Sequence, residues 1–532
     1  MSLESCYNQK SKADLVIYNA KIYSPDSVAD GVNCIAIKDG IITAIGSESE
    51  IRNKFEAADT INLAGAFIYP GFTDAHAHFT GFALGLRYAD ISQARSFGEV
   101  LDILKKYRQL HLEGWIIGQG WDQNNWPEKV FPDNTLLNQL FPGIPVVLTR
   151  IDGHAVLASD AAIKASGITF PGKPGESVIK NGKFTGIFLE GMTDKLRNAI
   201  PLPSVKEISE LLVTAAQKCH AAGLTAVTDA GLNKKEILLL DSLQKAGKIT
   251  LRIDAWISPN EENFKFFMKT PFFQTSFLRV GAVKMYADGA LGSRGACLLS
   301  PYSDDSPNQG LLTITAGELA TVCKRASECG FQVNTHAIGD SAVRMVLHTY
   351  SQFLKPGNDR RWRVEHTQVV NENDFELFGK YSIIPSVQAT HATSDMDWAG
   401  NRLGPERVKN AYAYHRLLLQ NGWIPNGTDF PIEGIAPLHT FYAAVARKDL
   451  QGEPAQGYMM ENALSRMDAL KSITCWASKA SFTEKERGNI EVGKMADFTV
   501  LDKDIIRIPE SQLTETKVLY TLVDGKIVYK SR

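Results

Sequence analysis

The middle of the chain, from residue 66 to about residue 470, alternates short apolar strand patterns with helical patterns. The eight predicted buried strands are Phe67–Asp74, Thr225–Asp229, Leu251–Ile257, Val280–Met285, Phe331–Thr335, Trp362–Glu365, Ile383–Gln388 and Trp423–Gly427. Most are followed by a helical pattern, such as Ala316–Glu328 and Ser341–Phe353. This alternation is typical of βαβ units around a parallel sheet. Because eight units close a barrel, the pattern predicts an α/β fold, a (β/α)₈ TIM barrel.

Both ends of the chain are rich in β-branched residues with a period of two. Asp39-Gly40 near the start and Asp524-Gly525 near the end each separate two such runs, as in a β-hairpin. We therefore expect one small β-sandwich domain made from both ends. The predicted domains are residues 1–65 and 471–532 for the two parts of the sandwich and residues 66–470 for the barrel.

Residues from about 90 to 213 do not fit the strand–helix repeat, and we expect them to form an insertion after the first barrel strand. This stretch contains Trp115, Trp121 and Trp126. Two interpretations remain open for these tryptophans. They form an apolar lid over the barrel mouth, which we favour slightly, or they form only the core of the insertion.

Two histidines follow the first buried strand, in the run Pro70-Gly71-Phe72-Thr73-Asp74-Ala75-His76-Ala77-His78. Side chains two residues apart in extended chain point to the same face, so His76 and His78 can reach one ion. Histidine is the commonest metal ligand in proteins. The alternative is that these are two core or surface histidines that are neighbours by chance, and for the pair alone the two interpretations have about equal weight.

Other polar residues lie at the carboxyl ends of further predicted barrel strands, where active sites of this fold form. These residues are Lys284, His336, His366 and Asp429. Nitrogen and oxygen donors of this kind suit one or two divalent cations, zinc first.

Lys284 lies within an apolar strand, where an unpaired ammonium group is costly. Burial lowers the pKa of such a lysine and leaves a nucleophilic amine. That amine can add carbon dioxide to give a carbamate, an oxygen ligand able to bridge two metal ions. The alternative is a lysine whose ammonium group extends to the surface.

Asp429 ends the eighth predicted strand and could simply cap the segment that follows. Beside a metal ion, the same carboxylate could hold the ion, take a proton from its bound water and pass that proton to a leaving group.

These residues together resemble the amidohydrolase superfamily, which includes urease and dihydroorotase. The resemblance covers nearly the whole chain and includes the Pro70–His78 run and Gly493-Lys494-Met495-Ala496-Asp497-Phe498. Within the superfamily the chain looks like the branch of N-substituted formamide deformylase. The runs that carry this closer resemblance are Lys284–Gly295, Val387-Gln388-Ala389-Thr390-His391 and Gly427-Thr428-Asp429-Phe430-Pro431.

The resemblance implies a binuclear metal centre. His76, His78 and Asp429 would hold one metal, His336 and His366 would hold the second, and Lys284 as a carboxylated lysine would bridge them. It further implies a metal-dependent amidohydrolase that cleaves a non-peptide carbon–nitrogen bond with metal-activated hydroxide and with Asp429 as acid and base. Formamides, other amides and cyclic amides are the candidate substrates. Alternatives are a hydrolytic deaminase, an ester or lactone hydrolase on the same site, or a non-catalytic metal-binding scaffold.

Further candidates for substrate binding lie near the predicted site. Tyr286 and Asp288 share the side of Lys284 on its strand, and His391 follows the seventh strand. Arg294 could pair with an anionic group or stabilise its loop. In the insertion, His154 and Glu190 could line the pocket, although structural roles compete with this interpretation.

The formal net charge of −2 gives no electrostatic argument for a nucleic-acid partner. No apolar stretch reaches the ~18 residues that a membrane span needs, and the expected partner is a small amide-type molecule. A homodimer is possible.

We expect a cytoplasmic protein. The alternative is a lipid-modified envelope protein, attached through Cys6, whose signal peptide has been removed.

Overall fold

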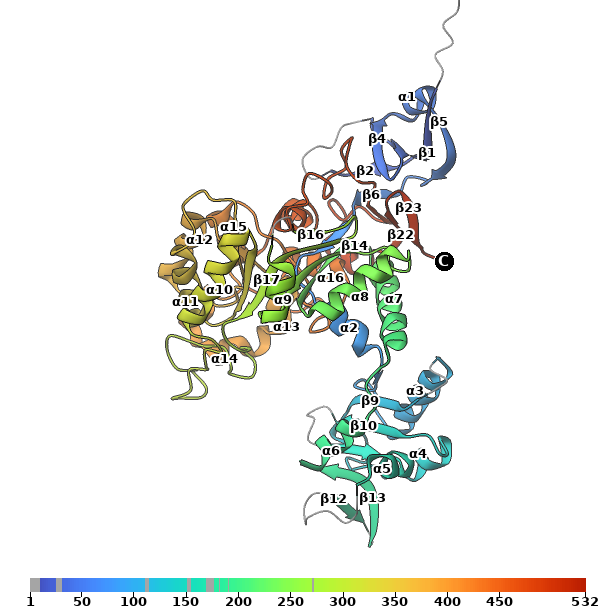
Figure 1. Ribbon diagram of the computed structural model, residues 1–532, viewed down its shortest axis with the longest axis vertical. Coiled ribbons are helices and arrows are strands. Elements are labelled where there is room, and N and C mark those ends of the chain that lie inside the picture. Colours follow the sequence, from blue (N-terminus) through green and yellow to red (C-terminus); the bar gives the residue numbers. More distant parts are fainter. Residues whose placement is uncertain are drawn as a thin grey trace, which may run out of the picture. The chain divides into compact units, whose positions relative to one another are not determined.

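The computed structural model describes residues 10–24, 31–110, 114–150, 155–168, 177–180, 182–189, 191–269 and 272–532. The chain divides into two compact units, residues 1–82 with 213–532 and residues 83–212. The first unit contains both the barrel and the β-sandwich, and the second is a separate α/β body (Figure 1). The domain boundaries near residues 65 and 470 stay a prediction.

Seven parallel strands form the barrel sheet of the first unit (Figure 1). In order around the sheet they are β7 (Phe72–Asp74), β14 (Leu224–Leu232), β15 (Arg252–Ile257), β17 (Leu278–Tyr286), β18 (Gln332–Ala337), β19 (Arg363–His366) and β20 (Ile384–Ser386). The eighth position is taken by the segment around Asn426, which forms a parallel bridge with Val387. On its other side the amide of Asp429 donates to the carbonyl of His76 at 2.8 Å. The predicted TIM-barrel fold is confirmed.

Two of the predicted strands differ from the observed ones. The run Phe67–Asp74 is two strands, because β6 (Phe67–Pro70) belongs to the sandwich and only β7 to the barrel. Gly71 separates them, and a Cβ atom there would lie 2.3 Å from Oγ1 of Thr225. The run Trp423–Gly427 forms only the bridge at Asn426, because the amide of Asn426 donates to the carbonyl of the helical residue Ser472 rather than to a neighbouring strand.

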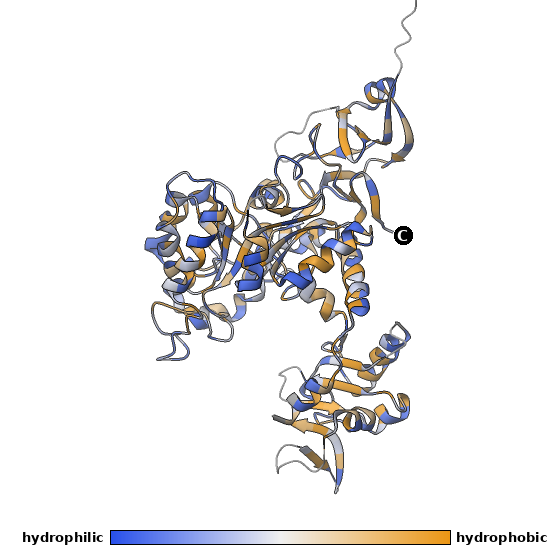
Figure 2. Cartoon of the chain, in the orientation of Figure 1, coloured by the Kyte–Doolittle hydropathy of each residue, from blue (hydrophilic) through white to orange (hydrophobic). Residues whose placement is uncertain are grey.

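Helices cover the outside of the barrel sheet (Figure 1). They include α7 (Val205–Ala221), α8 (Lys234–Lys245), α9 (Glu261–Phe267), α10 (Ala316–Cys329), α11 (Asp340–Ser351), α12 (Phe375–Tyr381), α15 (Tyr414–Asn421), α16 (Pro437–Ala446), α17 (Arg466–Ser472) and α18 (Cys475–Ala480). Helix α10 shows how local sequence sets the bounds. Thr315 and Glu318 form a capping box at its start, and Gly330 ends it with a left-handed φ of 77°. The barrel strands are predominantly hydrophobic (Figure 2).

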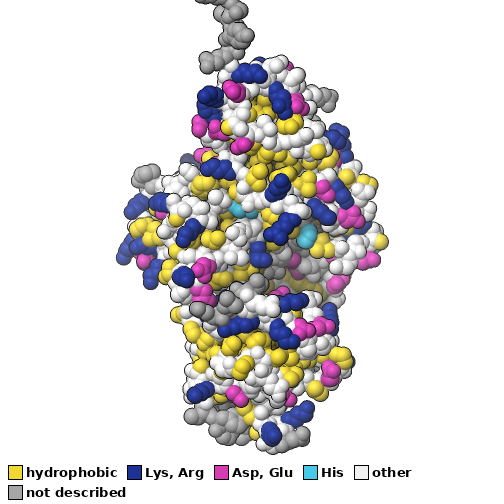
Figure 3. Space-filling model, turned by 90° about the vertical axis from the view of Figure 1, so that its right-hand side faces the viewer, with side chains coloured by type: hydrophobic (Ala, Val, Ile, Leu, Met, Phe, Trp, Pro, Cys, Tyr) yellow, Lys and Arg dark blue, Asp and Glu magenta, His cyan; other side chains and the backbone are white. Residues whose placement is uncertain are grey.

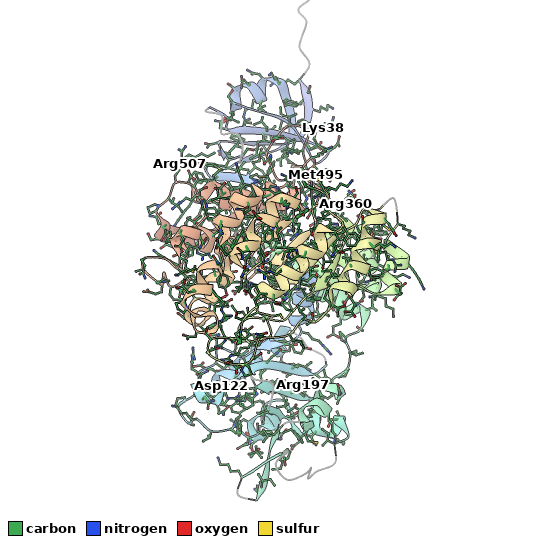
Figure 4. The ribbon with its side chains drawn as sticks, turned by 90° about the vertical axis from the view of Figure 1, so that its left-hand side faces the viewer. Lys38, Asp122, Arg197, Arg360, Met495 and Arg507 are labelled. Carbon is green, nitrogen blue, oxygen red and sulfur yellow. The ribbon has the colours of Figure 1, made fainter. Side chains whose placement is uncertain are left out.

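The sandwich packs two sheets against each other. One contains β4 (Ile41–Gly46), β3 (Cys34–Lys38), β1 (Ser11–Tyr18) and β5 (Phe55–Asn62). The other joins both chain ends through β2 (Lys21–Ile22), β6, β21 (Phe498–Leu501), β22 (Val518–Val523) and β23 (Lys526–Lys530). Ile37 and Phe498 are buried in the shared core. Met495, labelled with Lys38 in Figure 4, pairs with Ile41 and ties the ends together.

The second unit is built on the sheet β12 (Ser177–Lys180), β13 (Lys183–Leu189), β11 (Ala155–Ala158), β10 (Val146–Arg150), β9 (Ile116–Trp121) and β8 (Ala89–Asp90). Helices α3 (Phe97–Leu110), α4 (Thr135–Leu140), α5 (Asp160–Ser166) and α6 (Gly191–Ala199) accompany it. Asp122, labelled in Figure 4, follows β9 and accepts a 2.7 Å hydrogen bond from Arg150.

The tryptophans of the second unit belong to its cores. Trp121 and Trp126 are buried in one cluster, and Trp115 packs against another. The indole N–H of Trp121 donates to the carbonyl of Leu148, and that of Trp126 donates to Ala94. The favoured prediction of a lid is therefore wrong for Trp121 and Trp126, because their apolar surface and their N–H groups are already used inside the unit.

Basic and acidic side chains are interspersed over the face of the molecule in Figure 3. None of the described helices is both long enough and apolar enough to span a membrane.

Candidate active site

Five of the six predicted metal ligands line one cavity of about 360 Å³ in the barrel unit. They are His78, Lys284, His336, His366 and Asp429. The sixth, His76, is fully buried beside them. Each side chain comes from the carboxyl end of a different barrel strand or from the residues just after it, apart from the pair His76 and His78. This is the end of the barrel at which active sites form.

His76 lies at the centre of a buried polar network. Its Nδ1 is 2.6 Å from Oε2 of Glu365, and its Nε2 is 2.9 Å from Nζ of Lys284. Burial, followed by the positive charge of Lys284, lowers the pKa of His76 to about 4. The ring is therefore neutral at neutral pH, the state in which imidazole binds metal ions.

Glu365 is a functional neighbour that the sequence analysis did not assign. Its burial opposes ionisation, but Arg363 and His76 outweigh this effect and lower the pKa of Glu365 to about 2. Arg363 holds it through a 2.6 Å contact between Nε and Oε1. A usable signal was present, since two charged residues two positions apart in an otherwise apolar strand point to the same buried face.

In each of the other three histidines, one ring nitrogen contacts an oxygen atom of the protein. Nδ1 of His78 is 3.1 Å from the carbonyl oxygen of Ala230, and Nδ1 of His366 is 2.7 Å from Oε1 of Gln388. Nε2 of His336 lies 3.4 Å from the carbonyl oxygen of Gly289. Such contacts fix the orientation of metal-binding imidazoles and leave the second nitrogen for an ion.

Asp429 is the acidic centre of the site. Its Oδ1 lies 3.3 Å from Nε2 of His78 and 3.6 Å from Nε2 of His76. Burial opposes its charge, yet His78 and the neighbouring histidines lower the pKa of this carboxyl well below its usual value. Among the described residues, Oδ1 finds no hydrogen bond of normal geometry.

A divalent cation fits this arrangement. Donor atoms of His76, His366 and Asp429 all lie within 4.8 Å of one another. Two imidazoles and one ionised carboxylate are suitable ligands for zinc and similar ions. The unpaired buried oxygen of Asp429 is the kind of atom that an ion would satisfy.

Lys284 is completely buried, as its position in an apolar strand predicts. Burial lowers its pKa to about 8, although the carboxylates of Glu365 and Asp429 partly oppose this shift. The unprotonated amine is therefore a minor form at pH 7, but it is far more populated than in an ordinary lysine. This is the form that can react with carbon dioxide.

Of the residues predicted to bind substrate, some line the cavity and others have structural roles. Tyr286 and His391 line the cavity. Asp288 instead accepts hydrogen bonds from the amides of Cys297, Ile338 and Gly339, so it organises loops. Arg294 pairs with Asp304, which supports its alternative role in stabilising a loop.

Three predictions fall outside the residues that the structure describes. They concern His154 and Glu190 as pocket residues and Cys6 as a site of lipid attachment.

Further cavity residues were missed by the sequence analysis. Gln368, Asp395, Trp398 and Glu433 line the same space as the predicted ligands. They lie in loops and helices after the sixth, seventh and eighth strands, where no periodicity assigns a direction to the side chain. The only available signal was their short distance in sequence from His366, His391 and Asp429.

Asp74 connects two segments of the site through hydrogen bonds. It accepts hydrogen bonds from the amide of His76 at 3.1 Å and from the amide and hydroxyl of Thr428 at 3.0 and 2.7 Å. The carboxylate therefore links the end of the first strand, which His76 follows, to the segment that carries Asp429.

Comparison with known proteins identifies the family of the chain. The model of the amidohydrolase family matches residues 59–529. The Bacillus subtilis protein YtcJ is 32% identical over 521 residues, covering 96% of this chain and 98% of that protein. N-substituted formamide deformylase from Arthrobacter pascens is 26% identical, with 97% and 98% of the two chains covered.

A solved structure is similar over nearly its full length. This uncharacterized metal-dependent hydrolase from Pyrococcus horikoshii OT3 superposes with a TM-score of 0.75 and 27% identity. The match covers 93% of this chain and 99% of the other. The chain therefore belongs to the amidohydrolase family and is a metal-dependent hydrolase of that superfamily.

Proposed function

We propose that the protein hydrolyses a non-peptide carbon–nitrogen bond in a formamide, another amide or a cyclic amide. The observation that carries this proposal is the convergence of His76, His366 and Asp429 within 4.8 Å, next to the cavity that His366 and Asp429 line. The similarity to N-substituted formamide deformylase supports the choice of bond.

The proposed metal ligands fall into two groups. His76, His78 and Asp429 would hold one ion, and His336 and His366 would hold a second. Lys284 would bridge the two as a carbamate. We propose zinc as the ion because the donors are imidazole nitrogen and carboxylate oxygen. A divalent ion in this place would lower the pKa of a water molecule and polarise a substrate carbonyl group.

The protein groups then have distinct tasks in the hydrolysis. Asp429 is ionised and can accept the proton of the attacking water. As the carbon–nitrogen bond breaks, the same proton passes to the leaving nitrogen, which gives the amine and the carboxylic acid. Nε2 of His391 is buried, has no hydrogen-bond partner among the described residues and lies 3.8 Å from Oδ2 of Asp429. We propose that this nitrogen binds the carbonyl oxygen of the substrate.

The cavity wall indicates the shape of the substrate. Leu291, Ile338, Trp398 and Ile432 give it a largely apolar lining. Burial of apolar surface contributes about 25 cal/mol per Å². An amide with an apolar substituent is therefore favoured over a small, fully polar one.

A hydrolysis screen tests the proposal. Formamides, acetamides, cyclic amides, esters and aminopurines are incubated with the purified protein at neutral pH, with and without chelator, and the release of amine, acid and ammonia is measured. Chelator-sensitive release of an amine from amides is the expected result. Cleavage confined to esters, or release of ammonia from aminopurines alone, would contradict it.

Substitution of the proposed metal ligands distinguishes an enzyme from a non-catalytic metal-binding scaffold. His76→Asn and Asp429→Asn should lose both bound metal and activity, whereas Asp397→Asn, an exposed acid outside the cavity lining, should retain both. Full activity and metal content in Asp429→Asn would exclude the proposed ligand set.

A further inference from the structure

One part of the cavity wall is acidic and is not used by the proposed hydrolysis. Asp395 and Glu433 line the cavity together with Trp398 and Ile432. Asp395 lies between α13 (Ala389–Ser394) and α14 (Met396–Arg407), and Glu433 follows the eighth barrel strand. Two separate segments therefore bring carboxylates to the same space.

Each of these two carboxylates accepts a hydrogen bond from a hydroxyl group. Asp395 accepts a 2.7 Å hydrogen bond from the hydroxyl of Tyr412, and Glu433 accepts one of 2.6 Å from Ser394. No lysine or arginine of the described chain forms an ion pair with either. Burial, and more weakly the charge of Glu433, raises the pKa of Asp395, while Tyr412 and His391 oppose the shift. Burial therefore disfavours the charged form of Asp395, and a cation bound beside it would stabilise that form.

A cation next to Trp398 in the cavity wall is already engaged with other groups. The guanidinium of Arg402 lies 5.6 Å from the ring centroid of Trp398. It also contacts Asp304 and donates to the carbonyl of Gly292, so its charge is shared with groups other than Asp395 and Glu433.

Gln368 provides a second, independent observation. This side chain is only 4% exposed and lines the same cavity. Its Nε2 lies 3.0 Å from Nδ1 of His391, but its Oε1 has no partner among the described residues. A buried acceptor without a partner is costly, and a donor on a bound molecule would satisfy it.

We infer that the cavity selects amides that carry a second, protonated nitrogen, such as mono-N-acylated diamines, and that Asp395 and Glu433 bind this ammonium group. The inference rests on the proposed function, because it names the substrate class of the same site. The ammonium group would offset the carboxylate charges, its alkyl chain would contact Ile432 and Trp398, and an N–H of the substrate would donate to Gln368. A cation beside an indole ring gains further stabilisation.

The test compares two substrates of nearly equal size. N-formyl-1,5-diaminopentane carries a terminal ammonium group, and N-formylhexylamine carries a methyl group in the same place. The ratio of their kcat/KM values is measured for the metal-loaded wild-type protein, Glu433→Gln and Asp397→Asn. Asp397 is an exposed acid on α14 outside the cavity lining and serves as the matched control.

The expected wild-type preference for the ammonium substrate is about tenfold, which corresponds to one well-placed charge interaction. Glu433→Gln should reduce this ratio at least about fivefold, and Asp397→Asn should leave it unchanged. The preference should also decrease as salt is added. A ratio near one in the wild type, or a ratio that Glu433→Gln does not change, would overturn the inference while leaving amide hydrolysis intact.

Failure of the proposed function gives a different result, in which neither compound is cleaved. The same pair is then compared by calorimetric binding to the wild-type protein and to Glu433→Gln. Tighter binding of the ammonium compound that depends on Glu433 would support the acidic wall. Equal binding of the two compounds would refute it.

Discussion

The Nδ1 atom of His76 and the Oε2 atom of Glu365 lie 2.6 Å apart, and both side chains are completely buried. Arg363 contacts the same carboxylate, so the imidazole, the carboxylate and the guanidinium form one connected chain across the barrel interior. His76 is thus oriented by the barrel core rather than by solvent. A proposed metal ligand therefore depends on residues that do not line the cavity.

Glu365→Gln should weaken metal binding by roughly 10- to 100-fold. The amide can still contact His76, but it no longer carries the charge that holds the ring in place. Metal content after dialysis against a graded chelator series measures the effect. Glu376→Gln, an exposed substitution on α12, is the control. Equal metal retention in both variants would show that Glu365 does not position the ligand.

The metal-free protein should lose stability in acid because of Glu365. Its pKa falls from 4.5 to about 2 on folding, so the unfolded chain binds a proton more readily. This contribution, about 3 kcal/mol, is fully present above pH ~4.5 and disappears as the pH falls toward ~2. Urea unfolding of chelator-treated protein between these limits should show a shallower decline in Glu365→Gln than in the wild type. Parallel curves would contradict the assignment.

Lys284→Ala should lower the metal content from about two ions per chain to about one if a carbamate bridges the site. An excess of a short carboxylic acid should restore the lost ion, because its carboxylate can occupy the space of the carbamate. Elemental analysis provides the readout. Lys324→Ala, an exposed substitution on α10, controls for general effects of losing a lysine. An unchanged metal content in Lys284→Ala would exclude the bridging role.

Gly427→Ala should destabilise the protein by at least about 2 kcal/mol or prevent folding. A Cβ atom at this position would lie 2.4 Å from the amide nitrogen of His76 and 2.7 Å from its carbonyl oxygen, and neither backbone atom can move without disturbing the site. Gly400→Ala is the matched control, since nothing lies within 4 Å of its Cβ position in α14. Urea denaturation compares the two. Equal stability would show that the two strands can separate without cost.

Much of the fold follows from local pattern. The apolar strand runs and the capping residues of α10 are short-range features, and the positions of most barrel strands agree with them. The division of Phe67–Asp74 into two strands could not be read in the same way. It depends on the close approach of Thr225 to Gly71, two residues far apart in the sequence.

The site shows the same distinction. The six predicted metal ligands were recognisable from the sequence, because burying a polar residue at a strand end is costly unless it binds a partner. They are His76, His78, Lys284, His336, His366 and Asp429. Gln388 and Gln368 were not recognisable, because their importance comes from the partner that each contacts. The tryptophans of the second unit were ambiguous for a related reason, since composition does not indicate which neighbours cover an apolar ring.

The sequence by itself determined the alternation of strands and helices, the polar residues at the strand ends and the β-rich character of both chain ends. These features depend on periodicity and on the cost of burying charge, which act over a few residues. Only the tertiary structure decided which nitrogen of each histidine is held, how Asp74 joins the first strand to the last, and that Asp395 and Glu433 share the cavity. These relationships are distances between residues up to several hundred positions apart, and chain closure through the barrel brings them together.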